Sequence, residues 1–180
     1  MRIIGGAAKG RRLRSPRGTG TRPMMDRVRE ATFSSLGPFV VDAAVLDLYA
    51  GTGSVGLEAL SRGASSVVFV ESDREVLRVL EKNIEAVGLG GTIVGGSAER
   101  FLTGDRAQYD LAFVDPPYEA PLPSVDQVLA ALGERLNEGG VVVLHRRAGT
   151  GEPSLPPGLV LTDRRRYGSA EITRLSKEKA

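Results

Sequence analysis

A glycine-rich turn after the first buried apolar run has the residue types of a nucleoside-cofactor loop. Gly51, Gly53 and Gly56 fit the spacing G-x-G-x-x-G, in which glycines allow a tight turn and a close backbone approach to a ligand. Glu71 follows 20 residues after Gly51, where an acidic side chain accepts hydrogen bonds from ribose hydroxyls. This spacing alone does not separate NAD from other nucleoside cofactors.

Asp47 precedes these glycines and narrows the choice of cofactor. A carboxylate at that place would repel a pyrophosphate, but it can hold an ammonium group directly or through water. S-adenosylmethionine has a cationic amino-acid end and no phosphate, so Asp47 favours it over a dinucleotide. A glycine turn that only links a strand to a helix is the alternative, and it leaves Glu71 without a role.

A second motif, Asp115-Pro116-Pro117-Tyr118, ends the fourth apolar run, where open α/β sheets place their active sites. The two prolines fix the backbone, so the Pro116 carbonyl is a rigid acceptor beside the Asp115 carboxylate. Two acceptors suit an exocyclic amine, because they would orient its lone pair toward an electrophilic methyl group. Tyr118 offers an aromatic face to a base taken out of its stack. The alternative is a proline-rich loop without chemistry.

From residue 45 onward, predicted strands alternate with predicted helices. We expect this arrangement to bring the glycine turn and the tetrapeptide at Asp115 to one edge of a sheet. Apolar runs that alternate with helical stretches predict a parallel sheet with helices on both faces. The expected strands are 45–50, 67–70, 92–94, 111–114 and 141–144, and the expected helices are 24–36, 54–62, 74–87, 98–102 and 125–136. Residues 159–162 and 170–175 have no helix between them and predict a terminal antiparallel hairpin.

The composition excludes several classes of protein. The 180 residues contain no apolar run of about 18, the length that a membrane span needs, so we expect a cytoplasmic protein that does not bind membranes. The absence of cysteine excludes disulfides and thiolate chemistry. The single histidine, His145, argues against a metal site, and we expect it to be a structural residue at a strand end.

Basic residues are concentrated at the start of the chain. Residues 1–30 hold nine Lys or Arg and two Asp or Glu, whereas the remaining residues hold fifteen and twenty. This charge predicts a polyanionic partner, with nucleic acid as the first candidate and a solvated tail as the alternative. We therefore divide the chain into a basic extension, 1–22, and a catalytic domain, 23–180. The expected phosphate-binding residues are Lys9, Arg11, Arg12, Arg14 and Arg17.

Both motifs and the start of the chain resemble a known family. IIGG at residues 3–6, KGR at 9–11 and RPMMDRVRE at 22–30 resemble the RsmD family of bacterial 16S ribosomal RNA guanine-N2 methyltransferases. The tetrapeptide at Asp115 resembles the D/N/S-P-P-Y/F/W signature of enzymes that methylate exocyclic amines. The resemblance covers nearly the whole chain. It implies a Rossmann-like class I methyltransferase fold, with a seven-stranded α/β sheet, helices on both faces and a terminal antiparallel hairpin.

The resemblance implies S-adenosylmethionine as donor, S-adenosylhomocysteine as product and a flipped guanine of 16S ribosomal RNA as acceptor. The RNA would be presented in a partly or fully assembled small subunit, and we expect a monomeric enzyme. The implied catalytic residues are Asp115, Pro116, Pro117 and Tyr118. The implied cofactor-binding residues are Arg22, Asp47, Ala50, Gly51, Thr52, Gly53, Glu71, Ser72, Ser97 and Ala98. Ser97 stands where the family has an acidic residue near the adenine.

Other functions fit part of the pattern. An adenine-N6 methyltransferase acting on DNA or RNA would use the same tetrapeptide. Glutamine methylation of a protein fits less well, because that group favours Asn in place of Asp115. An NAD-dependent oxidoreductase explains the glycines and Glu71 but not Asp47. A non-enzymatic RNA-binding module needs the basic extension but gives the pocket no role.

Overall fold

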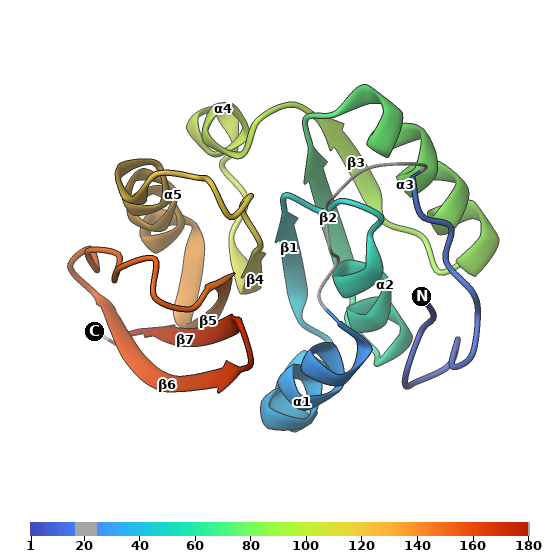
Figure 1. Cartoon of the computed structure of the whole chain (residues 1–180), viewed down its shortest axis with the longest axis horizontal. Helices are drawn as coiled ribbons and strands as arrows, with labels where there is room; N and C mark the ends of the chain where they lie inside the picture. The colour runs from blue at the N-terminus through green and yellow to red at the C-terminus, as the bar shows by residue number, and fades with distance from the viewer. Residues whose placement is uncertain (17–24, 180) are drawn as a thin grey trace.

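A computed structural model describes residues 1–16 and 25–179, which form a seven-stranded sheet covered by helices on both faces (Figure 1). The helical elements are α1 (Asp26–Leu36), the 3-10 helix η1 (Gly37–Val40), α2 (Ser54–Ser61), α3 (Arg74–Val87), α4 (Ala98–Gly104) and α5 (Leu122–Arg135). The strands are β1 (Ala44–Leu48), β2 (Ser66–Glu71), β3 (Thr92–Gly95), β4 (Tyr109–Val114), β5 (Leu136–Arg147), β6 (Leu159–Tyr167) and β7 (Ala170–Lys177).

The strand order is β3-β2-β1-β4-β5-β7-β6. Strands β1 to β5 pair in parallel, and β7 lies antiparallel to both β5 and β6. The expected fold, including the terminal hairpin, is confirmed. The chain moves outward from β1 to β3 and then returns to place β4 on the other side of β1. This reversal is a topological switch point, the place where open α/β sheets bind ligands.

Two apolar layers explain why the central strands read as continuous hydrophobic runs. Side chains such as Val45 and Phe113 face α1, α2 and α3, whereas Leu46 and Val114 face α4 and α5. Both faces of these strands are therefore buried, as expected of parallel strands between helices. The central strands are therefore packed from both sides by helices.

Strand β5 is longer than the sequence predicts. The expected strand covers 141–144, whereas β5 begins at Leu136, directly after α5. Gly139 adopts a left-handed backbone with φ 72°, and the register of β5 against β4 shifts between Tyr109 and Leu111. Gly139 and Gly140 thus lie inside the strand, which continues through an irregularity.

The first residues of the chain pack against its body, beside α2 and α3 (blue in Figure 1). Ile3, Ala8 and Leu13 are buried in the same layer as α1, α2 and α3. Arg2 and Arg12 form an antiparallel bridge within this segment. Residues 1–13 thus contribute to the core as well as carrying positive charge. Within residues 1–16 and 25–179, no helix combines the length and apolar character needed to cross a membrane.

Candidate active site

A cavity of about 890 Å³ opens at the carboxyl ends of β1, β2 and β4, where the strand order reverses. Cavities of this size commonly hold small-molecule ligands and cofactors. Ten of the predicted site residues line it: Asp47, Ala50, Gly51, Thr52, Glu71, Ser72, Asp115, Pro116, Pro117 and Tyr118. The fold therefore brings the glycine loop and the proline tetrapeptide to one cavity.

Glycines are needed in and after the loop that follows β1 for two reasons, a left-handed backbone and close packing of α2. Gly51 and Gly53 have φ angles of 56° and 77°, a backbone region that side chains disfavour. Gly53 also precedes α2, and a Cβ there would lie 2.5 Å from the Leu80 side chain. A Cβ on Gly56 would lie 2.3 Å from the Phe69 ring. The loop turns tightly, and α2 packs close to β2 and α3, because these positions lack side chains.

Glu71, at the end of β2, fixes this loop from the side. Its Oε2 accepts the backbone N–H of Gly51 at 2.9 Å, and its Oε1 accepts those of Ser72 and Asp73 at 2.8 and 2.9 Å. A carboxylate has about four lone-pair positions, so three such bonds leave capacity for a ligand hydroxyl. Glu71 is therefore held in one orientation at the cavity wall.

Asp47 is a buried carboxyl group beneath the cavity, with 2% of its surface exposed. Its Oδ2 accepts the backbone N–H of Gly56 at 2.9 Å. Burial raises the pKa of Asp47 well above its ordinary value, and the charges of Asp115 and Glu71 raise this pKa further. A cationic group beside Asp47 would offset this cost of ionisation.

The tetrapeptide after β4 presents its acceptors in a fixed arrangement. The two prolines hold the backbone, and the Pro117 carbonyl accepts the N–H of Ala120 at 2.9 Å. Among the residues that the structure describes, none donates a hydrogen bond to the Pro116 carbonyl. Tyr118 lines the cavity with 36% of its surface exposed. Asp115, Pro116 and Tyr118 thus stand at one side of the cavity.

His145 was expected to be structural, and the structure places it against Asp115. Its Nδ1 lies 2.7 Å from Oδ1 of Asp115, and the ring is 3% exposed. Val114 and Leu144 are partners in the parallel register of β4 and β5, so the next residue of each strand lies alongside the other. This contact could have been found by aligning the ends of the two strands, but no motif indicates it.

Tyr49, which precedes Ala50 and the glycines in the chain, also lines the cavity. Its φ of 59° lies in a region that non-glycine residues rarely adopt outside functional or strained sites. The hydroxyl donates to Oε1 of Glu99 at 3.1 Å. Burial and this carboxylate raise the pKa of Tyr49. The other lining residues that the motifs did not indicate are Ser15, Pro16, Ser54, Val55, Asp73, Val76, Glu119, Arg147 and Ser169.

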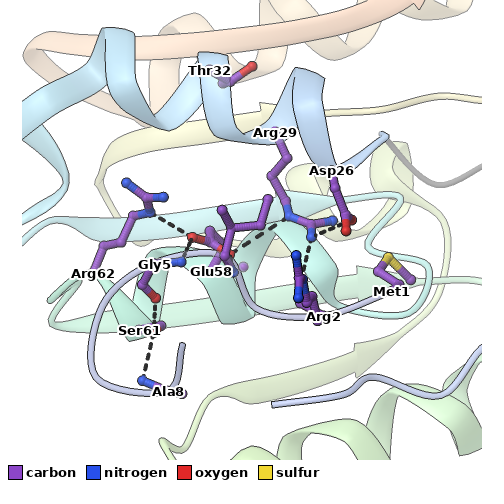
Figure 2. Close-up of polar contacts among 12 residues, drawn as sticks. Met1, Arg2, Gly5, Ala8, Asp26, Arg29, Thr32, Glu58, Ser61 and Arg62 are labelled. Carbon is purple, nitrogen blue, oxygen red and sulfur yellow. Dashed lines mark hydrogen bonds and ion pairs between the residues drawn. The ribbon is translucent and has the colours of Figure 1, made fainter. Parts of the chain in front are cut away.

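A buried carboxylate on α2 holds the start of the chain (Figure 2). The two Glu58 oxygens accept the backbone N–H groups of Ile4 and Gly5 at 2.7 and 2.8 Å. The buried guanidinium of Arg29 lies 3.8 Å from Glu58 and donates to the carbonyl of Arg2 at 2.6 Å. The N-terminal segment is therefore fastened to α1 and α2 by charged groups that water does not reach.

Asn83 of α3 connects the N-terminal segment to the glycine loop at the cavity. The Asn83 side chain bonds both backbone groups of Arg14 and also donates to the carbonyl of Thr52 at 2.9 Å. Ser15 and Pro16, which follow directly, line the cavity wall. The N-terminal segment and the glycine loop therefore share one anchoring residue.

The predicted RNA-binding residues divide into two groups. Lys9, Arg11, Arg12 and Arg14 are all exposed. Arg11 differs from the others because its guanidinium also donates to two carbonyls in the last turn of α3, at 2.6 and 3.1 Å. Its guanidinium thereby satisfies carbonyls that have no partner within the helix. Arg17 lies outside the described residues.

Some predicted cofactor-binding residues lie away from the cavity wall. Among those that the structure describes, Gly53, Ser97 and Ala98 are not part of its lining. Ser97 caps α4, and its side chain accepts the N–H of Arg100 at 3.3 Å. Arg22 lies outside the described residues.

The sheet order, the glycine loop after β1 and the acceptor motif after β4 define a Rossmann-like methyltransferase class. A family model described as "Conserved hypothetical protein 95" matches residues 1–176. The chain is 37% identical over 159 residues to the Escherichia coli K12 protein named "Ribosomal RNA small subunit methyltransferase D", covering 87% of this chain and 79% of that one. It therefore belongs to the RsmD family, which confirms the resemblance found in the sequence.

Solved structures agree with this membership. The Escherichia coli protein yhhF is 34% identical and superposes with a TM-score of 0.89, over 99% of this chain and 98% of that chain. A Thermus thermophilus protein, TTHA0928, is 35% identical with a TM-score of 0.81, over 97% and 98% of the two chains. The fold is therefore shared over the full length of these relatives.

Proposed function

We propose that the protein transfers a methyl group from S-adenosylmethionine to the exocyclic N2 amine of a guanine in 16S ribosomal RNA. The observation that carries this proposal is that Asp115 and Pro116 open into the cavity that Asp47 and Glu71 line. The family relative in Escherichia coli is named as a methyltransferase of the small-subunit ribosomal RNA. We further propose that the enzyme acts as a monomer in the cytoplasm, on a partly or fully assembled small subunit.

The described residues fit S-adenosylmethionine, which would supply an electrophilic methyl group on a sulfonium centre. Asp47 is a buried carboxyl group with no cationic partner among the described residues, and the amino-acid end of this cofactor carries an ammonium. Glu71 retains an acceptor position for the ribose hydroxyls. The loop at Gly51 provides the close backbone approach. Arg22, Ser97 and Ala98 remain proposed from the family resemblance alone.

The residues of the tetrapeptide prepare the acceptor amine. That amine is a poor nucleophile, because its lone pair is delocalised into the base. The Asp115 carboxylate and the Pro116 carbonyl would accept its two hydrogens and favour a pyramidal nitrogen. Tyr118 would stack on the flipped base. Once methylated, the nitrogen is cationic and loses one proton to the Asp115 carboxylate.

Exposed basic groups would hold the RNA backbone. Lys9, Arg12 and Arg14 lie on the segment that leads to Ser15 and Pro16 at the cavity wall. Phosphate contacts from such residues position a nucleic acid without reading its sequence. We propose these three residues, together with Arg17, as phosphate contacts.

A transfer assay tests the function. Small subunits from a strain that lacks the enzyme are incubated with labelled S-adenosylmethionine, and the RNA is digested to nucleosides. Label in N2-methylguanosine is expected. Label in N6-methyladenosine would replace the proposal with the adenine-N6 alternative. Binding of S-adenosylmethionine with no label in any nucleoside would contradict RNA methylation under these conditions.

A further inference from the structure

The pair formed by Asp115 and His145 joins the half-buried first residue of the tetrapeptide to a buried ring. The Asp115 side chain is 27% exposed, whereas the His145 side chain is 4% exposed. We propose that His145 is a positioning residue that orients the Asp115 carboxylate toward the acceptor amine. This inference rests on the proposed function, since it assigns a partner to the carboxylate that would receive the amine.

The polarity of the hydrogen bond follows from the chemistry of the two groups. An ionised carboxylate can only accept, so the proton between the two groups belongs to Nδ1 of His145. The 2.7 Å contact involves Oδ1 of Asp115. Within the described part of the chain, Oδ2 makes no hydrogen bond and remains available. The imidazole thus occupies one carboxylate oxygen and leaves the other for the amine.

The second ring nitrogen supports this assignment. Nε2 of His145 is buried and has no hydrogen-bond partner among the described residues. A buried polar atom without a partner is costly, and an apolar side chain of similar size would avoid that cost. The bond to Asp115 is therefore the one polar contact that the described residues give this ring.

The His145 ring also contacts Tyr118, the residue proposed to stack on the base. The Tyr118 and His145 rings contact each other edge to face, with centroids 6.0 Å apart and an interplanar angle of 76°. Arrangements of this kind are favourable for aromatic pairs. His145 therefore contacts two members of the tetrapeptide, one by a hydrogen bond and one through its ring.

The tautomer of His145 gives a test that does not depend on activity. The chain has one histidine, so the imidazole nitrogens of the untagged protein are observed by 1H–15N NMR without overlap from another histidine. We expect a protonated Nδ1 in the wild-type protein and a shift toward the Nε2-protonated tautomer in Asp115→Ala. A wild-type ring with an unprotonated Nδ1 would overturn the proposal.

Kinetics of two substitutions test the positioning role. His145→Asn keeps a donor near the place of Nδ1, whereas His145→Leu removes it. We expect His145→Leu to lower kcat by about 100-fold, with an unchanged affinity for S-adenosylmethionine, because misplacement of a reacting group has effects of this size. His145→Asn should recover at least about tenfold of this loss. Thr173→Val, a buried polar residue of β7, is the matched control.

The outcomes separate this proposal from the proposed function. Equal kcat for His145→Leu and wild type, or equal losses for the Leu and Asn variants, would overturn the positioning role. If the wild-type enzyme labels a base other than guanine, the proposed acceptor is wrong. The ratio of the variant rate to the wild-type rate still tests the positioning role of His145. If His145→Leu loses its thermal unfolding transition, or if no RNA accepts label, the NMR tautomer decides.

Discussion

Asn83 holds Arg14 by both backbone groups, accepting its N–H at 2.8 Å and donating to its carbonyl at 3.1 Å. This paired contact resembles the exchange between neighbouring strands, although it comes from a side chain of α3. The same amide nitrogen donates to the carbonyl of Thr52 in the glycine loop. One side chain therefore links the position of the N-terminal segment to the shape of the cavity.

Replacing Asn83 with Leu should destabilise the protein and weaken cofactor binding together. Three backbone groups would lose their partner, and we expect a loss of about 2–4 kcal/mol in the free energy of unfolding. Urea denaturation and calorimetric titration with S-adenosylmethionine measure the two effects. Lys82→Ala, at an exposed position of the same helix, is the control. Unchanged cofactor affinity in a destabilised variant would show that the segment and the loop are independent.

Replacing Asp115 with Ala should abolish methyl transfer while leaving S-adenosylmethionine affinity within a few fold. The carboxylate is proposed to contact the acceptor and not the cofactor, and loss of one such group costs about 100-fold or more in rate. Single-turnover transfer and equilibrium binding separate the two quantities. Glu134→Gln, on an exposed side chain of α5, controls for the change in charge. A variant with near-wild-type transfer would remove Asp115 from the mechanism.

Asp47 should make the stability of the ligand-free protein depend on pH. Its pKa is raised in the folded state, chiefly by burial, so the folded protein holds this proton more tightly than the unfolded chain does. Stability should therefore fall as pH rises above the ordinary carboxyl range and continue to fall up to the raised pKa. Asp47→Asn should flatten this dependence because the amide does not ionise, and its oxygen can still accept the Gly56 N–H.

Urea denaturation of wild type and Asp47→Asn, from about pH 4 to about pH 8, measures this dependence. The same variant should bind S-adenosylmethionine more weakly, because it offers no charge to the ammonium. Parallel stability curves for the two proteins would show that Asp47 has the same pKa in the folded and unfolded states.

Neutralising the exposed basic residues should weaken RNA binding and its dependence on salt. Replacing Lys9, Arg12 and Arg14 with Gln should reduce the slope of log affinity against log salt by about 2, if all three contact phosphates. Filter binding over a range of salt concentrations gives this slope. Arg11→Gln is the informative comparison, since its guanidinium caps α3. It should lower thermal stability more than the triple variant does. An unchanged slope in the triple variant would exclude phosphate contacts by these residues.

The placement of the cavity could be predicted because it follows from local signals. The apolar runs around Val45 and Leu111 are buried on both faces, and their carboxyl ends carry the glycine loop and the tetrapeptide. Parallel strands bring such ends together regardless of the loops between them. The roles of the lining residues remain predictions, since position in a cavity does not establish contact with a ligand.

The contacts made by His145 and by the N-terminal segment depend on tertiary register, and no sequence motif indicates them. His145 meets Asp115 only because β4 and β5 pair as they do. Ile3 and Leu13 are buried. They lie in a glycine-rich basic stretch without helical or strand periodicity, so the sequence has no hydrophobic pattern that indicates their burial. Two partners of this segment lie far along the chain, since Glu58 binds Ile4 across 54 residues and Asn83 binds Arg14 across 69.

The anchoring of the N-terminal segment also sets an order of events during synthesis. Residues 4 and 5 are synthesised before Glu58, which binds their backbone and lies more than 50 residues further along the chain. Asn83, the partner of Arg14, follows later still. The N-terminal segment, with its positive charge, therefore cannot form these contacts until α2 and α3 have been synthesised.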